Sequence, residues 1–201
     1  MVVIVKPSGE NHEAAHIPIK PFLSICYLIL QVLDKIGPTM TVLRQDVYQN
    51  IKRLELMHES NPTTISNNLV QILKLEAREG NAKKGSSCSK AFVWLTRTLE
   101  FTSSLLQILS KDPEKKMEKA VEESYDVTLK PWHGWISSTA SRVALKLVPE
   151  SKTFIDLLKT EDEDCDTLKQ KMQILVSLLV PFLEDIHCIL RLYNLDKLKS
   201  T

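Results

Sequence analysis

The chain has 201 residues, 43% of them hydrophobic and 25% charged, so it is long enough to bury a sizeable core without disulfide bonds. Lysine and arginine total 26 against 25 for aspartate and glutamate, and a net charge of +1 argues against nucleic acid as a partner. Four widely spaced cysteines without a C-x-x-C pair favour reduced, cytosolic thiols over a disulfide framework or a bound metal.

Apolar residues recur at intervals of three and four, and glycine is scarce, so we expect helices throughout. The predicted ranges are 21–36, 41–59, 64–79, 88–111, 115–130, 134–148, 151–159 and 164–193. Apolar stripes are expected to face inward at Phe22, Ile25, Ile29, Leu30 and Leu33 in the first helix and at Val42, Leu43, Val47, Ile51 and Leu54 in the second. The last helix reads as a buried helix rather than a membrane span, and we expect Pro181 to kink or split it.

The helix expected at 41–59 carries a polar face. Asp46, Asn50 and Arg53 stand at i, i+4 and i+7, so they project from one side as an acceptor, a mixed donor and acceptor, and a cation. A solvated surface with an ordinary ion pair produces the same spacing. The pattern therefore indicates a polar face and leaves its role open.

The helix expected at 88–111 adds an aromatic ring to a mostly apolar segment, with Trp94 and Arg97 at i and i+3. In one interpretation Trp94 anchors the core and Arg97 extends past it to solvent. In the other, the flat indole packs against the C–H face of a sugar, while the polar residues of the preceding helix bind the sugar hydroxyls. The second interpretation predicts a carbohydrate site.

The stretch KPWHGW, residues 130–135, places His133 between Trp132 and Trp135. His133 is either a structural histidine or a ring N–H donor to an amide or carbonyl oxygen at the mouth of a pocket. An indole suits a boundary between water and hydrocarbon because its ring is apolar and its N–H is polar. Trp135 is therefore a candidate membrane contact if it points outward.

Together, the D-x-x-x-N-x-x-R motif that begins at Asp46, the WLTR motif that begins at Trp94 and the HGW motif that begins at His133 resemble the glycolipid transfer protein family, and most closely its plant branch. The likeness extends from about Pro21 to about Phe182. It implies an all-α, single-domain, two-layer sandwich of about eight helices, without enzymatic activity or cofactor. We expect residues 1–19 to form an N-terminal tail and residues 20–201 to form the domain.

The resemblance also implies three groups of ligand-contacting residues. The headgroup-binding residues would be Asp46, Asn50, Arg53, Trp94 and His133, with Arg97 and Gln49 at the periphery. The tunnel for the lipid chains would be lined by Met40, Leu43, Phe101, Leu129 and Leu145. The membrane-docking residues would be Trp135, Trp132 and Lys130. Within the first group, Asp46 would bind the ceramide amide N–H, Trp94 would stack on the sugar, and His133 would donate to the amide oxygen.

The expected ligand is a sphingolipid with a neutral sugar, of the glucosylceramide or galactosylceramide type. Relatives that bind ceramide-1-phosphate have Lys and Arg at the positions of Asn50 and Trp94, and a phosphate dianion needs such cations. Three features depart from the family pattern. Gln49 replaces a usual Gly, Ser141 replaces a common Phe, and the C-terminal Tyr-Val of the mammalian member has no match in LDKLKST. Ceramide-1-phosphate transfer, and a sphingolipid sensor or helical adaptor that does not transfer lipid, remain the alternatives.

We expect a cytosolic monomer that touches membranes transiently while it carries lipid between them. The protein would shield the lipid chains from water, where each exposed CH₂ costs about 0.8 kcal/mol. An enzyme is the less favoured reading. A glycosidase needs two carboxylates and only Asp46 is expected in this cleft, and the sequence contains no G-x-S-x-G motif.

Overall fold

A computed structural model of the protein describes residues 15–60, 67–133 and 147–199, and these residues form helices without any strand. The α-helices are α1 (Ile19–Ile36), α2 (Thr41–Ser60), α3 (Leu69–Arg78), α4 (Cys88–Lys111), α5 (Met117–Thr128), α7 (Ser151–Leu158) and α8 (Cys165–Leu192). Two short 3₁₀ helices, η2 (Pro38–Met40) and η3 (Lys130–Trp132), precede α2 and follow α5. The all-α prediction is confirmed. Most of the helix expected at 134–148 lies outside the described residues.

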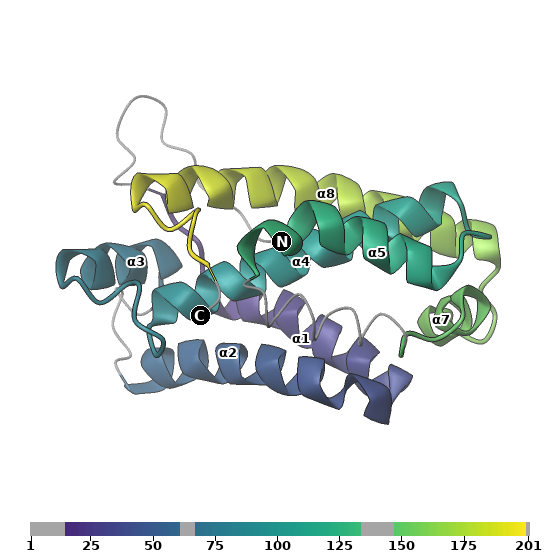
Figure 1. The fold of residues 1–201 in the computed structure, drawn as a ribbon, viewed down its shortest axis with the longest axis horizontal. Helices are drawn as coiled ribbons and strands as arrows, with labels where there is room; N and C mark the ends of the chain where they lie inside the picture. The colour runs from purple at the N-terminus through teal and green to yellow at the C-terminus, as the bar shows by residue number, and fades with distance from the viewer. Residues whose placement is uncertain (1–14, 61–66, 134–146, 200–201) are drawn as a thin grey trace.

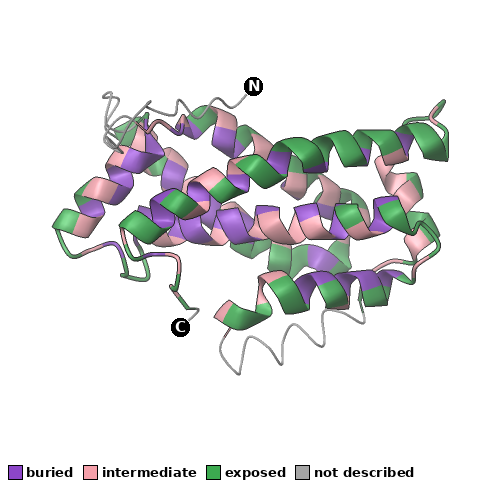
Figure 2. Ribbon diagram, turned by 90° about the horizontal axis from the view of Figure 1, so that it is seen from above, coloured by how far each residue is buried: buried purple, intermediate pink, exposed green. Residues whose placement is uncertain are grey.

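The helices form two layers, as the resemblance implied. Figure 1 shows α1 and α2 running side by side below α4, α5 and α8. Helix α4 is the central element because it packs against α8, α5, α3 and α2. Buried side chains gather on the inward faces of the helices, and the outer faces are exposed (Figure 2). The helix that carries Trp94 is therefore held on several sides.

The N-terminus of α4 is fixed by a buried carboxylate from another helix. Glu76 of α3 accepts hydrogen bonds from the Cys88 N–H at 2.8 Å, the Ser89 N–H at 2.7 Å and the Ser89 hydroxyl at 2.5 Å. The Ser87 hydroxyl accepts a further bond from the Lys90 N–H. A negative charge at a helix N-terminus satisfies free N–H groups and complements the helix dipole. This arrangement fixes where α4 begins.

Helix α3 begins later than the sequence predicted, and Asn68 explains the difference. Its side-chain oxygen accepts from the Val70 N–H at 3.0 Å as an N-cap and from the Ile17 N–H at 3.1 Å. Pro18 and Asn68 also form an isolated β-bridge. Asn68 is thus held in an extended conformation, which excludes the helix start predicted at residue 64. Ile17 and Ile19 are both fully buried beside this corner.

One prediction about a helix face was wrong. Val42 is 85% exposed and Leu43 is 44% exposed, so the buried apolar stripe of α2 consists of Val47, Ile51 and Leu54. Pro181 was expected to kink or split the last helix, and it does not split it, since α8 is continuous from Cys165 to Leu192. Both Pro181 and Ser177 are exposed, so the Ser177 carbonyl that loses its helical donor is on the side of α8 that meets water.

Helix α8 is also, among the described residues, a helix long and apolar enough to cross a membrane by length and composition. Its inner face belongs to the cores of the protein, and its buried residues are Leu168, Met172, Val176, Leu179, Leu183, Ile186, Ile189 and Leu190. It packs along α4. One face of α8 is therefore packed inside the protein, whereas its outer side exposes apolar residues such as Ile174 and Leu178, and 33% of its most apolar 18-residue stretch is buried.

Candidate functional site

The polar face predicted on α2 is present, and its three residues differ in burial. Asn50 is buried, and its side-chain N–H₂ donates to the backbone carbonyl of Asp46 at 2.9 Å. Asp46 is exposed and Arg53 is half-buried. Partial desolvation raises the pKa of the Asp46 carboxyl, and the positive charge of Arg53 opposes this shift. Gln49 lies on the exposed side of the same helix. Within the described chain no hydrogen bond or ion pair occupies the Asp46 carboxylate, so its oxygens can accept from a ligand.

Trp94 and His133 come together from α4 and from the residue after η3. Their rings are stacked with centroids 5.4 Å apart and planes at 28°. The Nδ1 atom of His133 lies 3.1 Å from the hydroxyl of Tyr125, which is on the last turn of α5. Burial, and secondarily the charge of Arg97, holds the pKa of His133 below its usual value. A neutral imidazole that accepts from Tyr125 at Nδ1 carries its proton on Nε2, which can then donate to a ligand.

Tyr125 was missed by sequence reasoning. It is buried and contacts His133 both through its hydroxyl and through its ring, with centroids 5.5 Å apart. The available signal was its place two helical turns before His133 on a segment predicted to be helical. Its hydroxyl sets the orientation of the imidazole, which is a role that a neighbouring residue commonly has at a binding site.

Arg97, which was predicted at the periphery of the headgroup site, is buried in the protein. Its guanidinium carbon is 4.8 Å from the centroid of the Trp94 ring and 4.4 Å from that of Trp132. One guanidinium nitrogen, Nη2, donates to the Asp196 carbonyl at 3.0 Å. Burial lowers the pKa of Arg97 to about 10, against the opposing charges of Glu100 and Asp196. Trp132 is thus packed on a buried cation, and its role at a membrane stays a prediction.

A second ionisable pair flanks Arg97 between α4 and α8. Glu100 contacts the Nε2 atom of His187, and both side chains are largely buried. Burial raises the pKa of Glu100 to about 7, although the Arg97 charge opposes the shift. Burial also lowers the pKa of His187, as do the charges of Arg191 and Arg97. The pair therefore favours states in which Glu100 is protonated or His187 is neutral.

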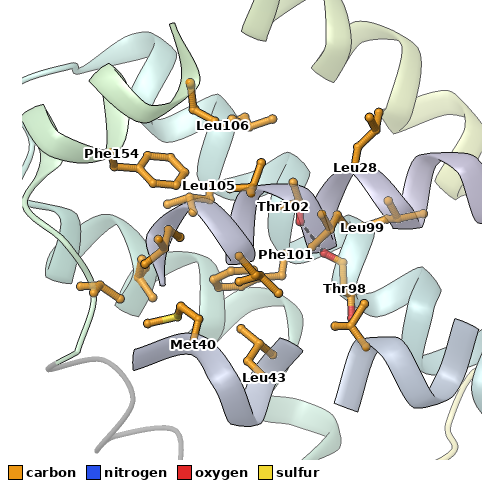
Figure 3. A pocket seen from close by; sticks show the side chains of 18 of the residues that line it. Leu28, Met40, Leu43, Thr98, Leu99, Phe101, Thr102, Leu105, Leu106 and Phe154 are labelled. Atoms are coloured by element: carbon orange, nitrogen blue, oxygen red, sulfur yellow. Dashed lines mark hydrogen bonds between the residues drawn. The ribbon is translucent and has the colours of Figure 1, made fainter. Parts of the chain in front are cut away.

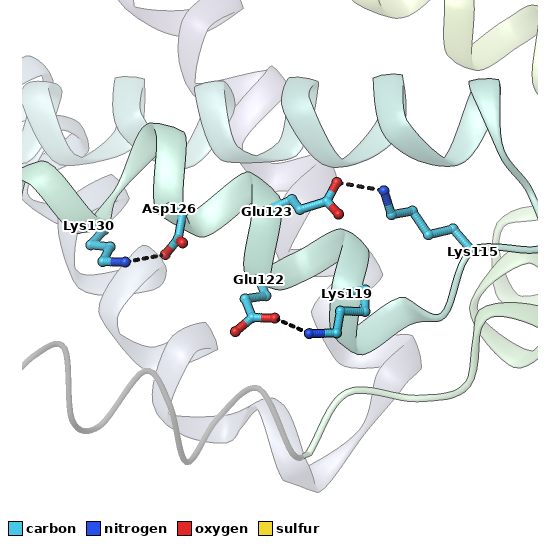
Figure 4. Close-up of polar contacts among 6 residues, drawn as sticks. All are labelled: Lys115, Lys119, Glu122, Glu123, Asp126 and Lys130. Carbon is cyan, nitrogen blue, oxygen red and sulfur yellow. Dashed lines mark hydrogen bonds and ion pairs between the residues drawn. The ribbon is translucent and has the colours of Figure 1, made fainter.

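Lys130 is on the charged outer surface of α5 and η3. Its ammonium group pairs with Asp126 at 2.9 Å, next to the pairs that Lys115 forms with Glu123 and Lys119 forms with Glu122 (Figure 4). Pairs of this kind on an exposed helix contribute little to stability. Lys130 thus presents its charge at the surface, and its contact with a membrane stays a prediction.

An apolar cavity of about 460 Å³ lies between the two layers. Four of the residues predicted for a lipid tunnel line it, namely Met40, Leu43, Phe101 and Leu129. Figure 3 shows the side chains of Met40, Leu43 and Phe101 around this space, with Leu105 and Phe154 on the far side. Of the groups described above, Tyr125 and His133 also line the cavity. The imidazole therefore belongs both to the aromatic cluster and to the cavity wall.

Several predicted residues cannot be placed. Trp135, Leu145 and the departure at Ser141 lie in the range 134–146, outside the described residues. The structure brings together Trp94, His133 and Arg97, and it puts Asp46, Asn50 and Arg53 on one helix. In the parts of the chain that the structure describes, no group of three or more potential metal-ligating side chains gathers.

Comparisons with known proteins agree with this geometry. The family model described as Glycolipid transfer protein matches residues 17–160. Glycolipid transfer protein 3 of Arabidopsis thaliana is 54% identical over 197 residues, which cover 98% of this chain and 84% of that protein. The similarity thus extends over nearly all of this chain.

Solved structures give the same fold. The structure described as showing how FAPP2 selects simple glycosphingolipids using the GLTP-fold has a TM-score of 0.81 and 27% identity, and covers 96% of this chain and 93% of that one. Human ceramide-1-phosphate transfer protein in complex with 12:0 ceramide-1-phosphate has a TM-score of 0.81 at 15% identity, covers 92% of each chain, and supports the fold alone. By family model, sequence identity and fold, the chain belongs to the glycolipid transfer protein family.

Proposed function

We propose that this protein is a non-enzymatic carrier that takes a sphingolipid with a neutral sugar headgroup from one membrane and delivers it to another. The observation that carries the proposal is the place of His133, which stacks on Trp94 and also lines an apolar cavity of about 460 Å³. A polar cluster that opens onto an apolar cavity suits an amphipathic ligand with a small headgroup and long chains.

The headgroup would be bound by both hydrogen-bond donors and hydrogen-bond acceptors. The Asp46 carboxylate accepts from the amide N–H of the ceramide and from sugar hydroxyls, while Asn50 and Arg53 donate to hydroxyl oxygens. Trp94 is half-buried, and the exposed part of its indole would contact the C–H face of the sugar. His133 donates from Nε2 to the amide oxygen. A neutral sugar needs this mixture because each hydroxyl both donates and accepts.

The chains would enter the cavity next to this cluster. Met40, Leu43, Phe101 and Leu129 line it, and Leu145 is proposed to join them. The described wall is made almost entirely of aliphatic and aromatic side chains, so a hydrocarbon chain gains the free energy of leaving water without losing hydrogen bonds. Extraction from a bilayer then exposes little chain to water.

A neutral sugar is favoured over a phosphate because few cations face the site. Arg97 contacts the Trp94 ring, but its guanidinium is buried, lies over two indoles and donates to the Asp196 carbonyl. Asn50 supplies an amide where a phosphate dianion would need a charge. Arg53 is then the remaining cation of the α2 polar face. The fold neighbour solved with ceramide-1-phosphate makes phosphate lipid the competing ligand to test.

The carrier is proposed to be a cytosolic monomer that docks transiently on membranes through Lys130, Trp132 and Trp135. Val42, which is 85% exposed, and Leu43, which is 44% exposed, add apolar surface at the start of α2. Leu43 also lines the cavity, so this surface is continuous with the space for the chains. Exposed apolar side chains next to a cavity mouth are typical of a site that meets hydrocarbon.

The test is the transfer of labelled glucosylceramide between vesicles, with ceramide-1-phosphate in parallel. We expect transfer of glucosylceramide and little transfer of the phosphate lipid. Asp46→Val should abolish transfer, and Glu59→Val, which replaces an exposed carboxylate near the end of the same helix and outside the site, is the matched control. Preferential transfer of ceramide-1-phosphate would reassign the headgroup. Binding of glucosylceramide without transfer would make the protein a sensor.

A further inference from the structure

We infer that Arg97 is a positioning residue for the sugar site, where its guanidinium, which lies over the rings of Trp94 and Trp132 and donates to the Asp196 carbonyl, sets the place of the Trp94 ring. The inference rests on the proposed function, because it assigns how the sugar-stacking ring of that site is held. Arg97 does not itself touch the ligand. It acts through Trp94.

The contacts of Arg97 come from three separate parts of the chain. Arg97 and Trp94 lie one turn apart on α4, Trp132 lies on η3, and Asp196 follows α8. The guanidinium carbon is 4.8 Å from one indole centroid and 4.4 Å from the other, within the range in which a cation is attracted to a ring face. A flat cation can contact two rings at once. Arg97 thus joins the two indoles into one unit.

Arg97 is a buried cation, and the free-energy cost of burying a charge indicates that it has a specific role. Arg97 is 2% exposed, and its Nη1 atom is buried without a hydrogen-bond partner among the described residues. Removing a charge from water is costly, and an apolar side chain would fill the same space at a lower cost. An arginine whose guanidinium forms one hydrogen bond, to the Asp196 carbonyl, among the described residues is therefore not needed to fill the core. What an apolar residue could not provide is the attraction to both indole rings.

Asp196, which accepts the hydrogen bond from Arg97, lies in the segment that follows α8. Leu195 is fully buried, its N–H donates to the Leu190 carbonyl at 2.9 Å, and Asn194 adopts a positive φ of 55°. The left-handed residue reverses the chain, so the segment returns to the core and presents the Asp196 carbonyl to Arg97. Figure 1 shows this last segment leaving the end of α8 and crossing towards α4. The end of the described chain is thereby part of the support of Trp94.

Arginine and lysine differ at such a position. The guanidinium is planar, stacks on rings with its apolar faces and still donates from its edge, whereas an ammonium is a compact and strongly hydrated charge. Lysine at position 97 would keep the charge but lacks the planar group that contacts both the Trp94 and Trp132 rings and donates to the Asp196 carbonyl at the same time. We therefore expect Arg97→Lys to loosen the Trp94 ring while leaving the lipid cavity unchanged.

The test compares two ligands that differ only in the sugar, glucosylceramide and ceramide with the same chains. Uptake of each from vesicles is measured at equilibrium for the wild-type protein and for Arg97→Lys. We expect Arg97→Lys to weaken glucosylceramide uptake by roughly tenfold, which is the size of a desolvated cation–π contact. Ceramide uptake should change by about twofold or less, since the cavity wall is intact. Equal losses for both lipids, or no loss for either, would overturn the inference.

A double-mutant cycle tests whether Arg97 acts through Trp94. In a Trp94→Ala background, Arg97→Lys should have almost no further effect on glucosylceramide uptake. An unchanged, additive effect would overturn the inference, because Arg97 would then act independently of the ring. Wild-type protein that takes up ceramide and glucosylceramide equally well would instead contradict the proposed function, so the two failures are distinguishable.

A second variant serves if Arg97→Lys does not fold. Trp132→Leu removes one side of the stack at a half-buried position and keeps apolar volume. It should reduce the preference for glucosylceramide over ceramide by several-fold, and Trp132→Phe should restore part of the preference because a ring is present again. Trp132→Leu with an unchanged preference for the glycosylated lipid would overturn the inference.

Discussion

The cavity and the aromatic cluster beside it share His133 and differ in how they are built. The cavity wall uses many similar side chains from α1, α2, α4, α5, α7 and α8, and each one supplies apolar surface. The cluster uses few side chains of different kinds, in which each ring, charge and hydroxyl has a defined partner. Loss of one wall residue leaves the wall apolar, whereas loss of one cluster residue removes a specific contact. Chain binding should therefore be tolerant of mutation and headgroup binding sensitive to it.

The largest expected effect comes from Glu76→Ala. Glu76 caps α4, and α4 contributes to both the cavity wall and the aromatic cluster, so the substitution should disturb both regions. In Glu76→Ala the Cys88 N–H, the Ser89 N–H and the Ser89 hydroxyl lose their buried acceptor. We expect the free energy of unfolding to fall by about 3–5 kcal/mol, the usual cost of removing one partner from a buried charged network. Chemical denaturation measures it. Glu79→Ala, at an exposed position near the end of the same helix, is the control and should change stability by under about 0.5 kcal/mol.

The next largest effect should break the headgroup site and leave the cavity intact. Asp46→Asn keeps the shape of the side chain and removes the charge that accepts from the ligand. We expect glucosylceramide affinity to fall by about 30-fold, or roughly 2 kcal/mol, as for loss of a charge-assisted hydrogen bond. Ceramide-1-phosphate affinity should fall less, because the lipid loses the same contact at its amide N–H but none to sugar hydroxyls, and because Asn repels a phosphate less than Asp does. Equal losses for the two lipids would contradict the assignment of Asp46 to the sugar hydroxyls.

A smaller effect concerns the ionisable groups on the far side of Arg97. The pKa of Glu100 is raised to about 7 in the folded protein, above its ordinary value of 4.5. Its contribution to stability is therefore fully present below pH 4.5 and is lost as the pH rises through about 7. Glutamine does not ionise, so Glu100→Gln removes this loss. Between pH 5 and pH 8 the free energy of unfolding of the variant should rise relative to that of the wild type by on the order of 1–2 kcal/mol.

Denaturation of both proteins at pH 5, 6.5 and 8 measures the gain of Glu100→Gln. His187 is present in both proteins, and its contribution to stability has the opposite pH dependence. Its pKa is lowered in the folded protein, so that contribution is lost as the pH falls. Arg97, Arg191 and Asp196 also act on this pair and are unchanged in the variant. Parallel stability curves for the two proteins across this pH range would show that Glu100 is not the group responsible.

The smallest effect should come from narrowing the cavity at its edge. Leu28 of α1 lines the cavity and is 56% exposed, so Leu28→Trp adds bulk with little cost to the core. We expect uptake of glucosylceramide with a long acyl chain to fall by about threefold, and uptake of a short-chain form to stay the same. Leu56→Trp, at an exposed position outside the cavity lining, is the control. Equal effects of the two variants would place Leu28 outside the path of the chain.

Sequence reasoning performed well where a pattern is local. The helices expected at 41–59 and 88–111 are observed as Thr41–Ser60 and Cys88–Lys111, because long periodic segments determine their own structure. The spacing of Asp46, Asn50 and Arg53 placed them on one helix for the same reason. Neither result required knowledge of the tertiary contacts. The ligand roles of these residues remain predictions.

Sequence reasoning failed where contacts join distant segments. The stack of Trp132 on Arg97 and the bond from Arg97 to Asp196 connect η3, α4 and the segment after α8, and no spacing rule relates these positions. The cap that Glu76 provides for α4 is of the same kind, because a glutamate on an amphipathic helix is expected at the surface. Such contacts depend on how helices pack, which single-sequence periodicity does not contain.

The cavity also bears on the thermodynamics of the empty protein. Side chains around a space of about 460 Å³ lack partners that a well-packed interior would supply, so the unloaded fold forgoes dispersion energy. A bound chain provides those partners, and any ligand that binds only the native state stabilises it in proportion to the logarithm of its concentration. The cargo would thus complete the core of its own carrier, and each delivery would return the protein to its less stable form.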